Sequence, residues 1–216
     1  MVTAAEAAPG NAVVTDTKGT VQYSEAGGEW QTLTTRKTLV PGTTIKTGVG
    51  SQVELFIKNN GPLRVLADTT VGLDKLNIDR SGVEVVVETQ LNLTKGTIQG
   101  HVDKLASASK YEVKTPHNVI GVKATAGPVD FQISADDKVA VKEGSLLVVY
   151  TAPGQAPGQF TVNAGQTFNP PTTPTGTPIV ATGPIPVILP FPAPLPPSPV
   201  PIVVVPEPFV FISPNR

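Results

Sequence analysis

The sequence contains no cysteine, which excludes disulfide scaffolds, thiolate metal sites and cysteine nucleophiles. Two histidines, one tryptophan and one methionine among 216 residues leave little material for metal or acid–base chemistry. Sixteen basic and seventeen acidic residues give a formal net charge of −1, so we expect no nucleic acid or anionic membrane as partner. Proline interrupts every long apolar run, and we therefore expect no transmembrane segment.

The abundant residues are 20 glycines and 23 prolines, and the prolines are unevenly placed. Seven precede Pro170, whereas sixteen lie from Pro170 to the C-terminus, where only two side chains are charged. This change predicts an all-β domain over 13–169 and an apolar, Pro-rich tail over 170–216. Residues 1–12 are Ala-rich, and we expect a flexible lead-in of the kind left by removal of a signal peptide.

Within 13–169, apolar residues recur at every second position in short runs that are separated by Gly, Asn, Asp or Pro-Gly. No apolar stripe of helical period extends beyond two turns, so the sequence predicts short antiparallel strands. A β-sandwich and a β-solenoid both satisfy this pattern. The runs include Val53, Leu55 and Ile57; Val83, Val85 and Val87; Val139 and Val141; and Leu146 and Val148.

Between residues 19 and 168, a further set of residues occurs in the same order as the sequence motifs of a known protein family. They are Leu39, Gly42, Ile45, Thr47, Gly48, Gly50, Ser51, Val53 and Leu55; Leu91, Leu93, Gly96 and Ile98; Tyr111, Val113, Thr115, Pro116, Val122, Lys123, Ala124, Thr125 and Phe131; and Val139, Val141, Glu143, Gly144, Leu146, Val148, Ala164, Gly165 and Gln166. This arrangement resembles the FecR domain family. Lys123-Ala124-Thr125 stands where the family has Arg-Gly-Thr.

The resemblance implies a bacterial, extracytoplasmic, solenoid-like β module without enzymatic activity. The best-known members are the periplasmic sensor part of an anti-sigma regulator that works with an outer-membrane transporter. In those members a cytoplasmic helical segment and one transmembrane helix precede the domain, and neither is seen in this sequence. Many other relatives are secreted or surface proteins.

Few residues are candidates for chemistry. His101 and His117 lie in unlike contexts without an evident carboxylate partner, so we expect neither a catalytic nor a metal site. Asp136-Asp137 is typical of a solvated turn. Trp30 and Tyr23 would have to be exposed on a groove to bind carbohydrate. We therefore expect no enzyme activity and no cofactor.

The tail is apolar where a flexible linker is normally polar. Its prolines from Pro184 to Pro196 occupy even positions, which would blunt one edge of a strand and leave an apolar face. Phe209–Ser213 is free of proline and charge, and the sequence predicts a terminal strand over 209–213. The residues expected to contact a partner are Ile185, Val187, Leu189, Phe191, Leu195, Ile202, Val204, Phe209, Phe211 and Ile212.

The acceptor of this tail is either the protein's own body or a neighbouring protein, which is a second copy or another envelope protein. The remaining alternative is a tail that is disordered or interacts with a membrane. The main functional prediction is a non-enzymatic structural or protein-interaction protein, such as a subunit of a surface fibre or envelope assembly that is joined by strand addition of the tail. One alternative is a periplasmic signal-sensing module of a FecR-type anti-sigma system. Another is a carbohydrate-binding surface module.

Overall fold

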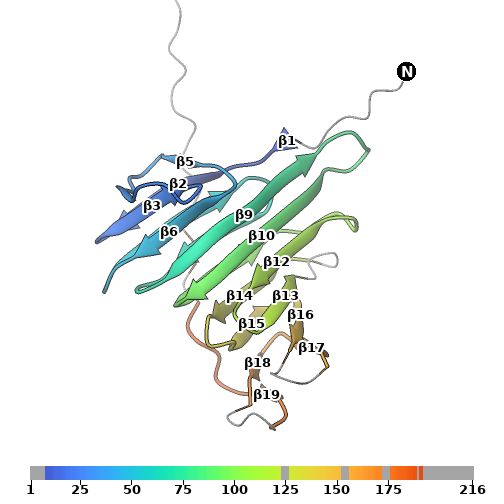
Figure 1. Ribbon diagram of the computed structural model, residues 1–216. Helices are drawn as coiled ribbons and strands as arrows, with labels where there is room; N and C mark the ends of the chain where they lie inside the picture. Colours follow the sequence, from blue (N-terminus) through green and yellow to red (C-terminus); the bar gives the residue numbers. More distant parts are fainter. Residues whose placement is uncertain (1–7, 123–126, 152–155, 172–175, 189, 192–216) are drawn as a thin grey trace, which may run out of the picture.

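Figure 1 shows the computed structural model of the chain, which describes residues 8–122, 127–151, 156–171, 176–188 and 190–191. These residues form nineteen β-strands in two sheets, which confirms the all-β prediction. No helix among them is long and apolar enough to cross a membrane.

The strands divide into a ten-stranded and a nine-stranded sheet. In spatial order, the ten-stranded sheet consists of β17 (Gly158–Asn163), β16 (Ser145–Tyr150), β13 (Asn118–Val122), β12 (Lys110–Lys114), β10 (Val86–Lys95), β9 (Thr70–Asp79), β6 (Thr43–Thr47), β3 (Val21–Glu25) and β4 (Gln31–Thr32), with β1 (Ala8–Pro9) beside β9. The nine-stranded sheet consists of β19 (Ile179–Thr182), β18 (Gln166–Asn169), β15 (Val139–Glu143), β14 (Val129–Ser134), β11 (Thr97–Val102), β8 (Gly61–Val65), β7 (Gln52–Ile57), β2 (Ala12–Lys18) and β5 (Thr38–Leu39).

Both sheets grow nearly in the order of the chain. The chain places one or two strands in one sheet and then crosses to the other, so each new hairpin extends the body along one axis. The described pairs are antiparallel except for β10 with β12, which are parallel. The exception arises because β11, in the facing sheet, lies between these two strands in the chain and provides the crossover that a parallel pair needs.

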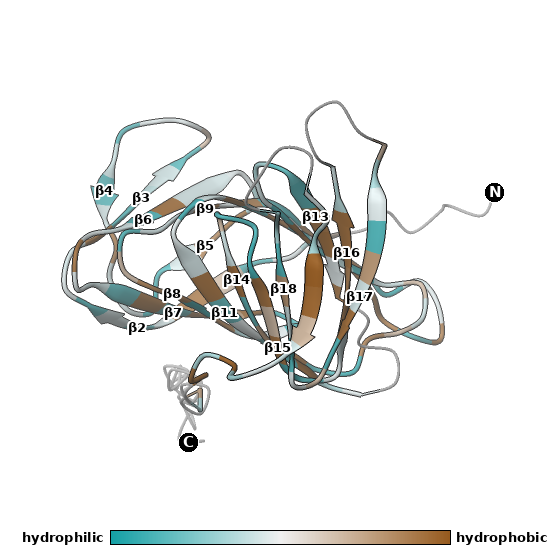
Figure 2. Cartoon of the chain, turned by 90° about the horizontal axis from the view of Figure 1, so that it is seen from below, coloured by the Kyte–Doolittle hydropathy of each residue, from teal (hydrophilic) through white to brown (hydrophobic). Residues whose placement is uncertain are grey.

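The two sheets enclose one hydrophobic core, and Figure 2 shows them as two layers. Alternate side chains of each strand point into this core, as strand geometry requires, and Val53, Leu55 and Ile57 are at most 2% exposed. The prediction that Val83 and Val85 lie in a strand is wrong, since both residues lie outside the strands and are exposed. The ladder between β9 and β10 ends where Asp79 lies opposite Val86, and the chain turns beyond that point without a facing sheet to cover it.

Gly100 on β11 shows how closely the core is packed. A Cβ at this position would overlap the Cζ of Phe131, which is completely buried on the neighbouring strand β14. The Tyr111 ring meets the Phe131 ring edge-on from the facing sheet, with centroids 6.1 Å apart. Burial raises the pKa of the Tyr111 hydroxyl. The absence of a side chain at residue 100 therefore makes room for the Phe131 ring and its contact with Tyr111.

The strands do not coincide with the predicted boundaries. β1 lies within the predicted lead-in 1–12 and pairs with β9, and β19 lies within the predicted tail 170–216 and pairs with β18. The edge strands at the C-terminal end of the body are thus β17 and β19 among the described residues. The predicted strand over 209–213 lies outside the described part of the chain.

Candidate functional site

A row of polar side chains crosses the outer face of the nine-stranded sheet. Its members occupy directly opposed positions of neighbouring strands, with Glu54 opposite Arg64, Arg64 opposite Gln99 and Gln99 opposite Gln132. Each lies between core residues of its strand and therefore points away from the core. Below, these four residues are called the polar row.

The polar row is joined by hydrogen bonds from end to end. Arg64 donates from Nε to Glu54 Oε1 over 2.8 Å, and its Nη2 lies 2.7 Å from the same oxygen. Arg64 Nη1 donates to Gln99 Oε1 over 3.1 Å, and Gln99 Nε2 donates to Gln132 Oε1 over 2.9 Å. Glu54, Arg64 and Gln99 are only 4–5% exposed, although they lie on the face opposite the core.

The chain segment after β19 crosses this row. Residues 184–188 and 190–191, called the strap below, run behind the sheets in Figure 1 and outside the nine-stranded sheet in Figure 2. Gln99 Nε2 donates to the carbonyl oxygen of Val187 over 3.1 Å, and Arg64 Nη2 donates to that of Pro190 over 3.0 Å. The guanidinium carbon of Arg64 lies 4.7 Å from the centroid of the Phe191 ring. The strap is thus held through its carbonyl groups.

A cavity of about 400 Å³ lies beside the beginning of the strap. Pro184 and Pro186 form one side of it, and side chains from β14, β15 and β18 form the other, including Gln132, Ala140 and Thr167. The polar row therefore borders this cavity at the end that is formed by Gln132.

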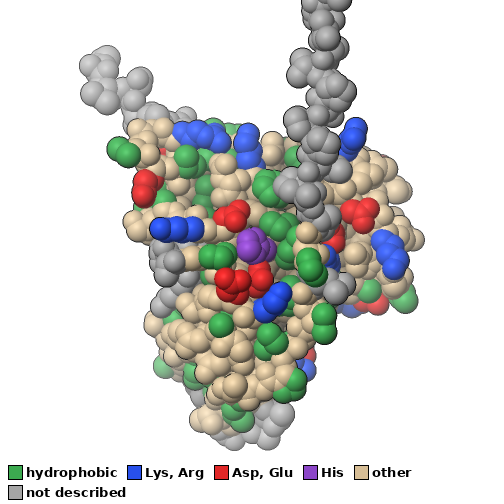
Figure 3. All heavy atoms as spheres, turned by 180° about the vertical axis from the view of Figure 1, so that it is seen from behind, with side chains coloured by type: hydrophobic (Ala, Val, Ile, Leu, Met, Phe, Trp, Pro, Cys, Tyr) green, Lys and Arg blue, Asp and Glu red, His purple; other side chains and the backbone are tan. Residues whose placement is uncertain are grey.

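His101 on β11 belongs to a separate charged group. Its Nδ1 lies 2.5 Å from Asp130 Oδ1 and its Nε2 lies 3.5 Å from Asp103 Oδ1, while Lys142 Nζ lies 3.8 Å from Asp130 Oδ2. The face seen from behind carries acidic and basic side chains interspersed around a histidine, without a large area of one sign (Figure 3). The expectation that His101 lacks a carboxylate partner is wrong, because β14 brings Asp130 beside it.

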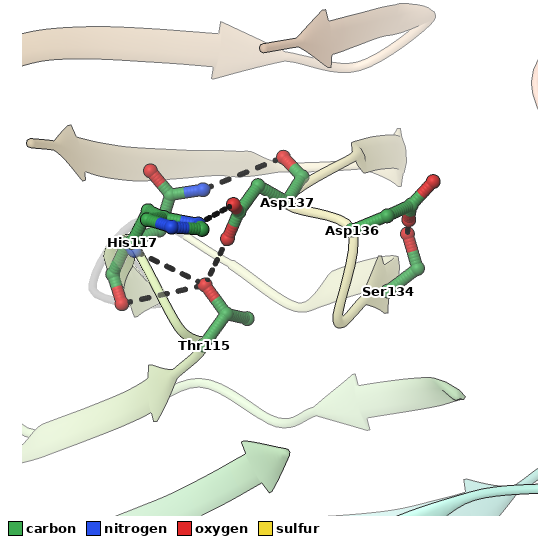
Figure 4. Close-up of polar contacts among 6 residues, drawn as sticks. Thr115, His117, Ser134, Asp136 and Asp137 are labelled. Carbon is green, nitrogen blue, oxygen red and sulfur yellow. Dashed lines mark hydrogen bonds and ion pairs between the residues drawn. The ribbon is translucent and has the colours of Figure 1, made fainter. Parts of the chain in front are cut away.

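His117 is also paired with a carboxylate, as Figure 4 shows. Its Nδ1 lies 2.7 Å from Asp137 Oδ2, and the Thr115 hydroxyl donates to Asp137 Oδ1 over 2.6 Å. Asp137 adopts a φ of 67° and is 4% exposed, so the predicted turn is present but this carboxylate is not solvated. Its neighbour Asp136 is exposed and interacts with Ser134 and Lys138.

The contacts of His117 differ from those of a histidine in a nucleophilic triad. In a nucleophilic triad the imidazole lies between the carboxylate and the hydroxyl. Here the hydroxyl of Thr115 and the ring of His117 both bond to Asp137, so the carboxylate lies between them. Among the described residues there is also no group of three or more His, Asp and Glu side chains that could hold a metal ion.

The predicted contact residues of the tail are only partly described. Ile185 and Phe191 are half-buried, and the side chain of Val187 is 78% exposed. The buried member of the strap is Ile188, which is 6% exposed and was not predicted as a contact. The other predicted contacts lie outside the described residues: Leu189, Leu195, Ile202, Val204, Phe209, Phe211 and Ile212.

Sequence reasoning also missed the polar row. A charged or amide side chain at the outward position of a strand is ordinary, so Arg64 and Gln99 look like solvated residues in the sequence. Nothing local indicates that a segment more than 80 residues later in the chain covers them. Of the two predicted carbohydrate contacts, Trp30 is 47% exposed beside Lys46, whereas Tyr23 is buried and its hydroxyl donates to Gln31.

Comparison with protein families identifies the middle of the chain. A family model described as FecR protein matches residues 43–147. The chain carries a FecR domain. Its matched part begins at the first residue of β6 and ends within β16, so all four members of the polar row lie in the FecR domain and the strap lies outside it. No curated protein matches the chain.

Proposed function

We propose that the chain is an extracytoplasmic, non-enzymatic module of the FecR sensor type, which binds another protein of the bacterial envelope and reports its state. The observation that carries this proposal is the FecR match over residues 43–147. We infer further that the body is a sandwich built in solenoid-like fashion, because successive hairpins add to both sheets in chain order.

Two features of the described residues support a binding role rather than catalysis. The hydroxyl–carboxylate–imidazole order at Thr115, Asp137 and His117 offers no base directed at a nucleophile. The polar row, in contrast, holds a polypeptide segment through buried donors. Recognition of main-chain carbonyls is a common mode of protein–protein interaction.

The fibre-subunit prediction receives no support from the FecR match. It depended on strand addition by the C-terminal residues, and Leu195 and everything after it lie outside the described part of the chain. The described part of the tail includes β19, which pairs with β18, and the strap, which contacts the body of its own chain. We therefore favour sensing over polymerisation.

An in-frame deletion in the source bacterium tests this proposal. If the protein is a sensor module, we expect transcription of a limited set of envelope genes to change, and a plasmid copy of the full gene to restore it. Transcript profiling with growth-matched cultures provides the measurement. Unchanged transcripts together with lost or altered surface material in electron micrographs would show a structural subunit instead.

The site of action is tested separately by fractionation. We expect the native protein in the periplasmic or surface fraction, protected from protease in intact cells if it is periplasmic. Recovery in the cytoplasm, with cytoplasmic and periplasmic marker proteins correctly separated, would contradict the proposed location.

A further inference from the structure

The polar row has a chemistry that suits one kind of ligand. Proline lacks the N–H group, so a segment with Pro184, Pro186 and Pro190 offers more carbonyl acceptors than N–H donors. Because these prolines all occupy even positions, they remove N–H groups from one edge of the extended segment, and that edge cannot form an ordinary ladder of hydrogen bonds with a sheet. The side chains of Arg64 and Gln99 supply such donors, and they donate to the carbonyl oxygens of Pro190 and Val187.

The spacing of the two bonded carbonyls fits the same chemistry. They belong to residues 187 and 190, three positions apart, and in an extended proline-rich segment with three residues per turn such carbonyls face the same side. Phe191 follows directly and lies against the guanidinium of Arg64. The polar row therefore contacts the carbonyls of residues 187 and 190 and one aromatic ring of a proline-rich segment.

The donors are also held by contacts within the row that do not involve the strap. Arg64 is fixed by Glu54 through two contacts to one oxygen, and Gln99 is fixed between Arg64 and Gln132. Side chains ordered by their neighbours lose little conformational entropy when they bind a ligand. This is the property of a built binding site rather than of an incidental surface contact.

We propose that the polar row is a docking site for an extended proline-rich segment of another protein, and that the strap is a resident occupant which this segment replaces. The inference rests on the proposed protein-interaction function and names the chemistry of the partner. The cavity beside Pro184 and Pro186 leaves space next to the strap for the first residues of an incoming segment. The strap would then act as a cover that keeps the site closed until the partner is present.

A second copy of the chain is a weaker candidate for this occupant. Exchange of straps between two copies replaces each contact by an identical one, while association costs translational and rotational freedom. A different segment can gain contacts that the strap does not make. It must still overcome a tethered competitor, whose effective concentration is on the order of millimolar for short flexible tethers.

Peptide binding to the full chain tests the proposal. The probe is a fluorescent peptide with the strap sequence PIPVILPF and terminal lysines for solubility, titrated in fluorescence anisotropy. In the Ile188→Asp chain a carboxylate replaces the buried strap side chain and expels the strap, while the polar row stays intact. We expect the peptide to bind this variant at least about ten-fold more tightly than the wild-type chain, because the tethered competitor is removed.

Two controls locate the binding. Adding Gln99→Leu to Ile188→Asp removes one carbonyl donor, and we expect it to weaken peptide binding about ten-fold. A peptide in which the three prolines are alanine should bind several-fold more weakly, since it is less ordered when free. Both chains are first checked by circular dichroism and melting, and Phe191→Ala replaces Ile188→Asp if the latter does not fold.

The outcomes are distinct. If the folded strap variants do not bind the peptide, or if Gln99→Leu leaves binding unchanged, the proposed site is wrong. If the wild-type chain forms a dimer in solution that Ile188→Asp dissociates, the occupant is a second copy, and the proposal of another protein is overturned. None of these results affects the transcript test, so failure here leaves the sensor proposal standing by itself.

Discussion

At the scale of single residues, Asp137 combines roles that seldom coincide. It holds a left-handed turn between β14 and β15, accepts hydrogen bonds from Thr115 and His117, and is almost fully buried. Aspartate tolerates the left-handed region better than most residues because its short side chain bonds locally. A buried carboxylate needs such partners to offset the loss of water. The group is therefore structural, and it ties this turn to the start of β13.

Replacing Asp137 should accordingly reduce stability. Asp137→Ala removes two accepted hydrogen bonds and leaves a left-handed alanine, and we expect the free energy of unfolding to fall by about 2–4 kcal/mol. Urea denaturation measures it. His117→Ala is the matched control, because its side chain is 52% exposed and should cost less than about 1.5 kcal/mol. Equal losses in the two variants would contradict this account.

Gly100 offers a second test at this scale. An added methyl group would overlap the ring of Phe131, so we expect Gly100→Ala to destabilise the fold by about 1–3 kcal/mol. Gly121→Ala is the control, since a Cβ on this other strand glycine would meet only ordinary contacts. We expect it to be neutral or slightly stabilising, by up to about 1 kcal/mol. A destabilisation confined to Gly121→Ala in thermal melts would overturn the packing argument.

At the scale of elements, the pair of Glu54 and Arg64 joins β7 to β8 away from the core. Both side chains are nearly buried, and removing one partner leaves the other charge without compensation. We expect Glu54→Leu and Arg64→Met to cost about 3–5 kcal/mol each. The double variant should cost about 2–3 kcal/mol less than the sum. Denaturant titration of the four chains gives the coupling, and additive losses would show that the pair does not act as a unit.

On the β9–β10 hairpin, Lys75 and Glu88 form an ion pair that is partly exposed to solvent. A hydrogen bond from Lys75 holds the pKa of Glu88 below its usual range, with Asn77 adding a second donor. The folded state therefore releases this proton more readily than the unfolded state. The stability so gained is present above the unfolded pKa, near 4.5, and is lost as the pH falls through the lower folded value.

The resulting pH dependence should be small, because the side chains of Lys75 and Glu88 are 49% and 40% exposed. We expect Glu88→Gln to remove less than about 1 kcal/mol at pH 7 and nothing at a pH below the folded pKa. Melting curves between pH 3 and pH 7 measure the difference from the wild-type chain. Glu84→Gln, in the connection between the same strands, is the control, and a loss that grows toward acid pH would have the wrong sign.

The elements could be predicted from the sequence where each strand has its own periodic signal. Val53, Leu55 and Ile57 alternate with polar residues, and their burial follows from strand geometry alone. Val83 and Val85 carry the same signal but lie beyond the end of a ladder, which only the pairing of β9 with β10 reveals. The polar row was not predictable for the same reason, since its burial depends on a strap that is distant in the chain.

At the scale of the whole molecule, growth of both sheets in chain order has a structural consequence. Each hairpin packs mainly on the hairpins before and after it, so the body behaves like a repeat array with two ends. The strap departs from this order, because it starts after β19 and returns to β8, across the four strands β18, β15, β14 and β11 that lie between them in the sheet. It therefore links the last part of the body to its middle and braces strands that otherwise contact only their neighbours.

Removing the strap tests this bracing role. Burial of Ile188 contributes about 1.5–3 kcal/mol and the two side-chain bonds about 1 kcal/mol each, against the entropy of ordering a segment already stiffened by proline. A net gain of about 1–3 kcal/mol corresponds to a melting temperature higher by about 3–10 °C. We expect a chain ending at Gly183 to melt lower by this amount, whereas a chain ending at Phe191 should melt like the whole protein. If instead only the chain ending at Phe191 loses stability relative to the whole protein, and the further cut to Gly183 adds nothing, the residues after the strap stabilise the body and the strap does not.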